Sequence, residues 1–259
     1  MPIIGSKGGG SINAFGFGAA GFSSIIATGG TITEYGIYRL HTFTGSGTFN
    51  ISKVGNAPGA GTYDYFGLGA GSAGVGGQVH VVLGAGGAAG IKKGSNAVSA
   101  NTGSYPITIG TGGTLGPVSG TSSPSNSGNA STFFGQTANG GNGLSGQSRT
   151  GGSNNDFSGA TVNVGQGTGG GAGAGANASA ADGGNGASSS IDGTNNVHGG
   201  GGAGGIGTAG SGGGGPFGFG GSTATANRGS GGGGVGANAG GGSTGSDGVV
   251  WIRYQIKAS

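Results

Sequence analysis

The sequence predicts an all-β protein: a small antiparallel β framework joined to a glycine-rich region of packed polyglycine II helices and long loops, with essentially no α-helix. Three observations predict this class. Glycine contributes 78 of the 259 residues. Isoleucine, leucine, valine and phenylalanine together contribute only 44, too few for a hydrophobic core of the usual size. The charged fraction is only 6%, whereas disordered chains usually carry high charge.

The glycine-dense second half limits what the chain can build. Between residues 165 and 245, glycines recur at every third position in short registers, for example at Gly212, Gly215 and Gly218. Three residues per turn is the period of the polyproline II helix, which leaves each backbone N–H and C=O without an internal partner. Glycine-only faces allow such rods to approach and bond to one another. A flexible linker is the alternative, whereas collagen is excluded because the registers break and the chain has only 6 prolines.

Residues 1–36 are interpreted as an N-terminal arm for attachment or oligomerisation, with a flexible terminus as the alternative. Its bulky side chains are separated by glycines and include Phe15, Phe17 and Phe22. The arm has no charged region followed by an apolar stretch, as a signal peptide would. No run in the chain approaches the roughly 18 apolar residues that span a membrane, so we expect no membrane insertion. Cysteine is absent, which excludes disulfides.

Residues 37–164 are predicted to be mostly strands. The runs YRLHTF (38–43) and TFNISKV (48–54) are rich in β-branched and aromatic residues and predict a hairpin. Further strands are predicted at 62–68, 77–87, 104–113 and 131–137. Residues 165–247 are predicted to form the glycine-rich rods, and 248–259 the closing strand. Because VVWIRYQIKA (249–258) is the most apolar run, we expect it at the centre of a sheet.

Residues that could carry chemistry are few and scattered. The three histidines are isolated, and the six acidic residues show no metal-binding spacing: Glu34, Asp64, Asp156, Asp182, Asp192 and Asp247. Matches to G-x-G-x-x-G occur, but they are expected by chance in so glycine-rich a chain and none precedes an amphipathic helix. The 9 lysines and arginines form no cluster. We therefore expect no catalytic site, no cofactor, no metal site and no nucleic-acid binding.

An ordered set of motifs resembles a known family. HTFTGSGTF (41–49), VHVVLGAGGAAG (79–90) and YPITIGTGG (105–113) precede a glycine-rich half that ends in GSDGVVWIRYQI (245–256). This order resembles the glycine-rich domain of bacteriophage tail-fibre and receptor-binding virion proteins, whose final strand has the pattern G-x-hydrophobic-x-I-R-Y. The resemblance covers residues 37–259 and implies stacked polyglycine helices, adhesion to a host surface, and no catalysed reaction.

The resemblance implies a virion protein made in the host cytoplasm and assembled into a phage tail. Its expected partners are other tail proteins, through the arm, and a host glycan or outer-membrane protein; by analogy with fibres, we expect a homo-oligomer, most simply a trimer. Rigid aromatic side chains in predicted loops are the candidate receptor contacts: Phe217, Phe219, Tyr63, Tyr65 and Phe66. Two alternatives are a purely structural virion protein and an ice-binding or extracellular glycine-rich protein.

Overall fold

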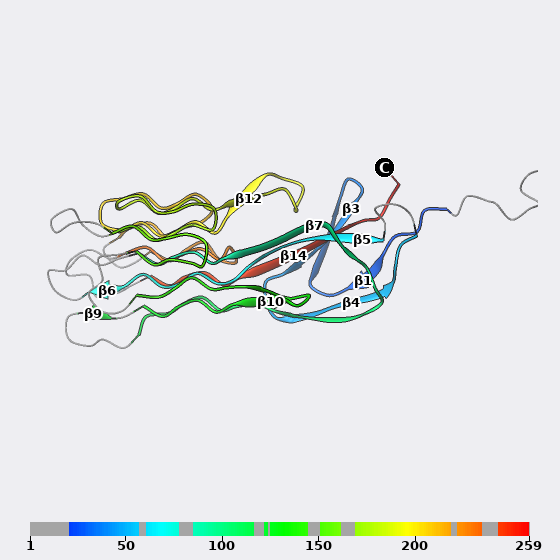
Figure 1. The fold of residues 1–259 in the computed structure, drawn as a ribbon, viewed down its shortest axis with the longest axis horizontal. Coiled ribbons are helices and arrows are strands. Elements are labelled where there is room, and N and C mark those ends of the chain that lie inside the picture. The colour runs from blue at the N-terminus through cyan, green and yellow to red at the C-terminus, as the bar shows by residue number, and fades with distance from the viewer. Residues whose placement is uncertain are drawn as a thin grey trace, which may run out of the picture.

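The computed structural model describes nine parts of the chain: residues 21–56, 61–77, 85–116, 122–123, 125–144, 151–161, 169–218, 222–234 and 243–258. Within these parts it contains strands and no helix, and the strands pair in antiparallel fashion. The molecule is elongated (Figure 1), with the larger sheets in one half and glycine-rich segments running to the far end. The predicted all-β class is confirmed.

Two five-stranded sheets form the β framework. The central sheet has the order β2 (Thr31–Tyr35), β3 (Tyr38–Phe43), β14 (Val249–Gln255), β5 (Thr62–Leu68) and β7 (Ile91–Ser99). The outer sheet has the order β1 (Ile26–Thr28), β4 (Gly47–Lys53), β8 (Gly103–Thr108), β10 (Ser131–Phe133) and β11 (Gln136–Ala138). Two short pairs complete the described strands: β6 (Gly76–Gly77) with β9 (Ser122–Ser123), and β12 (Ala187–Ser189) with β13 (Asn196–His198).

The middle of the central sheet is buried on both of its faces, which explains the apolar sequence of β14. Val250, Ile252 and Tyr254 belong to a core shared with the outer sheet. Val249 and Trp251 belong to a second core, on the side of the hairpin β12–β13. Since successive side chains of a strand point to opposite faces, a strand between two cores is apolar at nearly every position. The predicted central placement of this strand is confirmed.

The predicted hairpin of 38–43 with 48–54 is wrong. Both strands form, but β3 pairs with β2 and β14, whereas β4 pairs with β1 and β8. Each strand therefore has both edges occupied, and the three-residue connection between them crosses from one sheet to the other. The segment 131–137 forms two strands, β10 and β11, rather than one.

Part of the predicted arm belongs to the β framework. Within residues 1–36, β1 joins the outer sheet and β2 joins the central sheet. The strands β2 and β3 are connected by a two-residue turn, closed by the pair Tyr35 and Tyr38, in which Gly36 has a φ of 55°. Phe22 is half-buried, whereas Phe15 and Phe17 lie outside the described residues.

The glycine-rich segments bond to one another with a period of three residues, as the polyglycine II interpretation requires. Along residues 69–74 the N–H groups donate in turn to three neighbouring segments: 85–90, 125–130 and 243–248. Residues three apart share a neighbour, since Gly69 and Ser72 donate to the carbonyls of Gly90 and Gly87, at 3.3 and 2.9 Å. A β-strand would instead alternate between two neighbours. We call these segments the rods.

Glycine is required where rods touch. A Cβ on Gly201 would overlap the carbonyl oxygen of Gly171 and would lie 2.6 Å from that of Ala172. Similar clashes with backbone atoms would occur at Gly71 and Gly140. These last two positions lie outside 165–247, so the rods are not confined to the second half of the chain.

Several rods end together, at the end of the molecule opposite the two large sheets. Ala85 donates to the carbonyl of Gly169 at 3.2 Å, and Gly74 donates to that of Ser243 at 2.9 Å. Ala85, Gly169 and Ser243 each follow directly on a range that lies outside the described residues. The pair β6–β9 lies at this same end (Figure 1).

Candidate functional site

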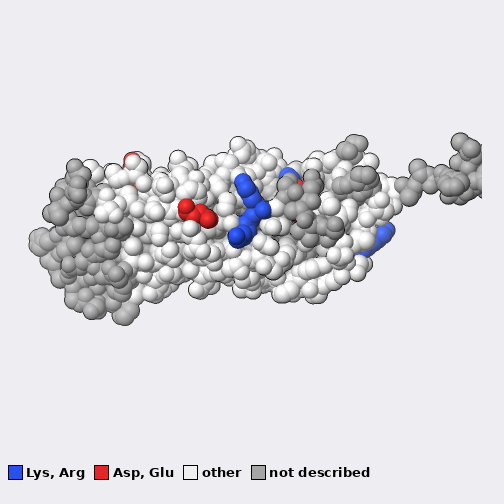
Figure 2. Space-filling model, viewed as in Figure 1, with Lys and Arg blue, Asp and Glu red and all other residues white. Residues whose placement is uncertain are grey.

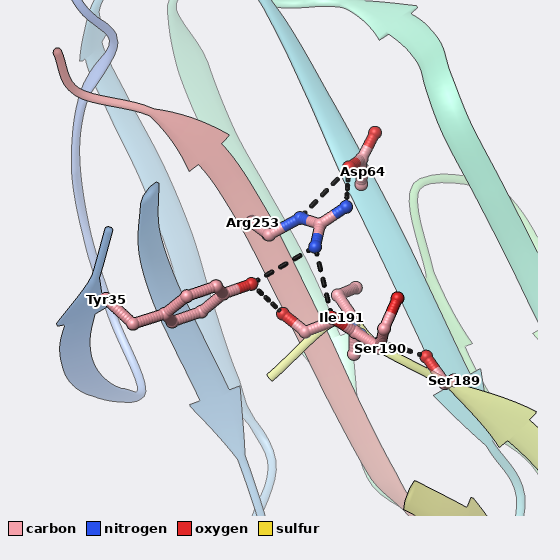
Figure 3. Close-up of polar contacts among 6 residues, drawn as sticks. All are labelled: Tyr35, Asp64, Ser189, Ser190, Ile191 and Arg253. Atoms are coloured by element: carbon pink, nitrogen blue, oxygen red, sulfur yellow. Dashed lines mark hydrogen bonds and ion pairs between the residues drawn. The ribbon is translucent and has the colours of Figure 1, made fainter. Parts of the chain in front are cut away.

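A cluster of polar contacts joins the β framework to the glycine-rich half, and we call it the junction (Figure 3). It consists of Tyr35 on β2, Asp64 on β5, Arg253 on β14, and Ser190 and Ile191 in the loop after β12. Arg253 and Asp64 are directly opposite each other on neighbouring strands. The alternation along β14 directs Arg253 to the same face as Trp251, which is the face that the hairpin β12–β13 covers.

The Arg253 guanidinium uses all three of its nitrogens in the junction. Nε and Nη2 donate to Oδ2 of Asp64 at 3.0 and 2.5 Å. Nη1 donates to the Tyr35 hydroxyl at 3.1 Å and to the Ser190 carbonyl at 3.2 Å. The Tyr35 hydroxyl in turn donates to the Ile191 carbonyl. Three strands and one loop are thus held by a single side chain.

The protonation states of the junction favour these contacts. Burial raises the pKa of Tyr35, although Arg253 opposes the shift. Burial lowers the pKa of Arg253, but the bonds to Tyr35 and Asp64 outweigh it and leave that pKa above its ordinary value. Tyr35 therefore keeps the proton that it donates to Ile191, and Arg253 keeps its charge.

A cavity of about 410 Å³ lies beside the junction, lined by Asp64, Arg253, Lys93 and the serines of β12 and its loop. A second cavity, of about 590 Å³, also includes Lys93 and extends to Asp156. Because Arg253 is already bound to Asp64, Lys93 is the exposed charge of the first cavity. Charged side chains are sparse on the face shown in Figure 2. The hydrogen bonds of the junction are all made within the protein, so the junction stabilises the fold.

Two of the predicted receptor contacts are core residues, so their expected exposure in a loop is wrong. Tyr63 and Phe66 are each only 2% exposed and lie on β5. Tyr63 belongs to the core between the sheets, and Phe66 to the core beneath the hairpin β12–β13. Both are buried because β5 lies between β14 and β7 in a sheet that is covered on both faces.

The other predicted contacts are placed differently. Tyr65 is half-buried and packs edge-on against Phe133, with the ring centroids 5.5 Å apart. Phe217 is half-buried in a rod, next to Phe219, which lies outside the described residues. The structure therefore does not bring the five predicted contacts together, and receptor binding by any of them stays a prediction.

The family model of the glycine-rich domain matches residues 43–255, most of the chain. The protein belongs to the glycine-rich domain family. No curated protein matches the chain. The match begins at the last residue of β3, so it covers β4 to β14 and the rods but leaves out β1 and β2. Most of the β framework and the lattice therefore lie within one glycine-rich domain.

The closing motif of this glycine-rich domain, Gly248 to Tyr254, has a structural explanation at each end. A Cβ on Gly248 would overlap Oγ of Ser131 and lie 2.5 Å from the Leu68 carbonyl oxygen. Arg253 holds the junction, and the hydroxyl of Tyr254 meets Nε2 of the buried His41 at 3.1 Å. The sequence alone indicates no role for Arg253, because its partner Asp64 is distant in the sequence.

The domain buries two histidines in different settings. His41 bonds through Nδ1 to the Gly29 carbonyl at 2.7 Å; since a carbonyl only accepts, Nδ1 carries the proton. His198 is 3% exposed and packs against Trp251, with the ring centroids 4.7 Å apart. Neither ring nitrogen of His198 has a hydrogen-bond partner among the described residues. Burial lowers the pKa of both histidines, and for His198 the nearby Arg228 lowers it further while Asp192 opposes.

We expect the free energy of unfolding to decrease as the pH falls below about 6.5, the ordinary pKa of histidine. The unfolded chain binds protons at His41 and His198 more readily than the folded chain, so acid favours unfolding. Each unit by which a pKa is lowered corresponds to about 1.4 kcal/mol. Urea unfolding at pH 8 and pH 5 measures the loss, which should be smaller in His198→Phe. An equal loss in both proteins would contradict this assignment.

Among the described residues there is neither a cluster of metal ligands nor a membrane-spanning helix. No three histidine or acidic side chains come close enough together to hold a metal ion. None of the described segments is a helix long and apolar enough to cross a membrane.

Proposed function

We propose that the protein is a structural component of a bacteriophage virion, most directly a tail-fibre or receptor-binding component that attaches the particle to the host surface. It would be made in the host cytoplasm and carried in the tail, as a homo-oligomer such as a trimer. Residues before the first strand would contact other tail proteins. A host glycan or outer-membrane protein would be the receptor. No catalysed reaction is part of this role.

The observation that carries the proposal is the rod lattice. Its backbone groups bond to several neighbouring rods in turn, so that bending one rod strains the bonds of all its neighbours. Such a lattice forms a stiff body from a chain with few large side chains. The β framework at one end and the shared rod ends at the other give this body two distinct ends (Figure 1). A stiff body with distinct ends is suited to holding an attachment point away from a particle.

Burial of the predicted contacts favours a second candidate, a purely structural virion protein. Tyr63 and Phe66 are in the cores and are unavailable to a receptor. In this role the same lattice would act as a spacer or a fibre component without binding the host.

Immunogold electron microscopy separates the two roles. Antibodies raised against the purified chain would be applied to phage particles, and their Fab fragments would be tested for inhibition of adsorption to host cells. Label at the free ends of fibres together with blocked adsorption supports attachment. Label elsewhere on the particle with normal adsorption supports the structural role. Particles without any label would overturn both, provided that antibodies to the major capsid protein label the same preparation.

A further inference from the structure

A second region with a cavity, distinct from the junction, lies at the turn between β10 and β11. The cavity has a volume of about 440 Å³, within the usual range for small-molecule sites. Its aromatic walls come from Tyr63, Tyr105, Phe133 and Phe134, and its lining contains no charged residue. The chemistry of this lining favours a neutral ligand with at least one apolar face.

Phe134 holds an unusual backbone conformation at this cavity. It has a φ of 50°, and with Gly135 at 71° it forms the two-residue turn between β10 and β11. Turns of this kind favour asparagine, aspartate or glycine, because a bulky residue with positive φ is strained. The ring packs against Tyr63 and Tyr105, with centroid distances of 4.8 and 5.5 Å. It nevertheless remains only half-buried, and strain of this kind is concentrated at functional positions.

Polar groups accompany the aromatic walls. Asn101 and Gln136 line the same cavity with exposed amide side chains, and the Tyr105 hydroxyl is fixed by donation to the Asn101 carbonyl at 2.9 Å. The cavity thus combines a ring surface for stacking with amide and hydroxyl groups for hydrogen bonding.

We propose that this cavity binds one pyranose residue of a neutral saccharide. The apolar face of the sugar ring stacks on Phe134 beside the inclined ring of Tyr105, and the sugar hydroxyls bond to the side chains of Asn101 and Gln136. A pyranose has both an apolar face and a rim of hydroxyls, and it carries no charge that the lining would leave unpaired. This site lies in the β framework and does not depend on the proposed role in a phage particle.

Saturation-transfer NMR on the full chain tests the proposal. The probes are maltotetraose, cellotetraose and mannotetraose, with tetragalacturonate as the charged comparison. We expect saturation to pass from aromatic protons to at least one neutral probe. We expect Phe134→Asn to weaken binding at least tenfold and Gln136→Ala three- to tenfold, while Gln255→Ala, which is outside the cavity, changes it less than twofold.

Both cavity variants are expected to keep the fold, so a loss of binding reports on the cavity. Phe134→Asn gives the Asn-Gly sequence that such turns prefer, so the hairpin is retained while the ring is removed. Gln136 is exposed, so its truncation leaves the core unchanged. Absence of transfer to all three neutral probes at 10 mM would overturn the proposal. So would binding of tetragalacturonate alone, or unchanged affinity in both cavity variants.

Discussion

Gly201→Ala is expected to lower the free energy of unfolding by about 3 kcal/mol or more, at the upper end of the range for overpacked interiors. The added Cβ would collide with the backbone of Gly171 and Ala172, which cannot move aside as a flexible side chain could. Gly201 itself donates to the Gly184 carbonyl at 2.9 Å, so moving it strains a third rod. Urea unfolding measures the stability, and amide hydrogen exchange measures the protection of residues 169–175 and 199–204.

Gly45→Ala is the matched control for this prediction. An added Cβ at Gly45 meets nothing within 4 Å, and its backbone φ is not positive. The same substitution should therefore change stability by less than about 1 kcal/mol and can be slightly stabilising. Equal effects of the two variants, or rod amides that exchange at random-coil rates in the parent protein, would contradict the lattice.

Arg253→Met is expected to lower the free energy of unfolding by about 2–3 kcal/mol. Side chains of Arg253 and Asp64 are 19% and 14% exposed, so the Asp64 carboxylate would lose its charge partner in a largely dry site. Removing one member of a fully buried pair costs about 3–5 kcal/mol, and the residual exposure of this pair reduces that figure. The Ser190 carbonyl and the Tyr35 hydroxyl also lose a donor. Urea unfolding and amide exchange near Ile191 measure the effect.

The chain contains a matched pair for comparison. Arg39 and Glu34 are also opposite each other on neighbouring strands, but at the exposed edge of the central sheet, with side chains 31% and 46% exposed. Arg39→Met should therefore lower the free energy of unfolding by less than about 1 kcal/mol. Adding Asp64→Asn to Arg253→Met should recover part of the loss, since no charge is then left unpaired. A cost for Arg253→Met no larger than that for Arg39→Met would show that the junction does not hold the two halves together.

The rods were predictable where glycines recur at every third position, but those of the first half were not. In residues 69–75, Gly71 and Gly74 meet neighbouring backbone, whereas Ala70, Ser72 and Ala73 fill small spaces and are fully buried. A rod therefore accepts alanine or serine at positions where a Cβ does not point at the backbone of a neighbouring rod. This mixture resembles an ordinary loop in the sequence, and only the three-dimensional arrangement identifies it.

The burial of the candidate receptor contacts could not be predicted, for a related reason. The alternation of side chains along β5 suggests that one face of the strand is exposed to solvent. Tyr63 and Phe66 nevertheless point to opposite faces, and both are buried. The second covering layer is the hairpin β12–β13, more than a hundred residues further along the chain. The pairing of Arg253 with Asp64 depends on the same long-range register. The central position of β14 was predictable from its local sequence, because the strand is apolar on both of the faces that the two layers cover.

The central position of β14 has a consequence for synthesis of the protein on the ribosome. This strand is the last in the described chain, yet it separates β3 from β5, and Val250 is paired with Phe43 about 200 residues earlier. Until it emerges, the edges of β3 and β5 that pair with it present backbone N–H and C=O groups without their partner strand. The central sheet can therefore close only after β14 has left the ribosome, and until then the nascent chain depends on its low content of large apolar residues, or on chaperones, to avoid aggregation.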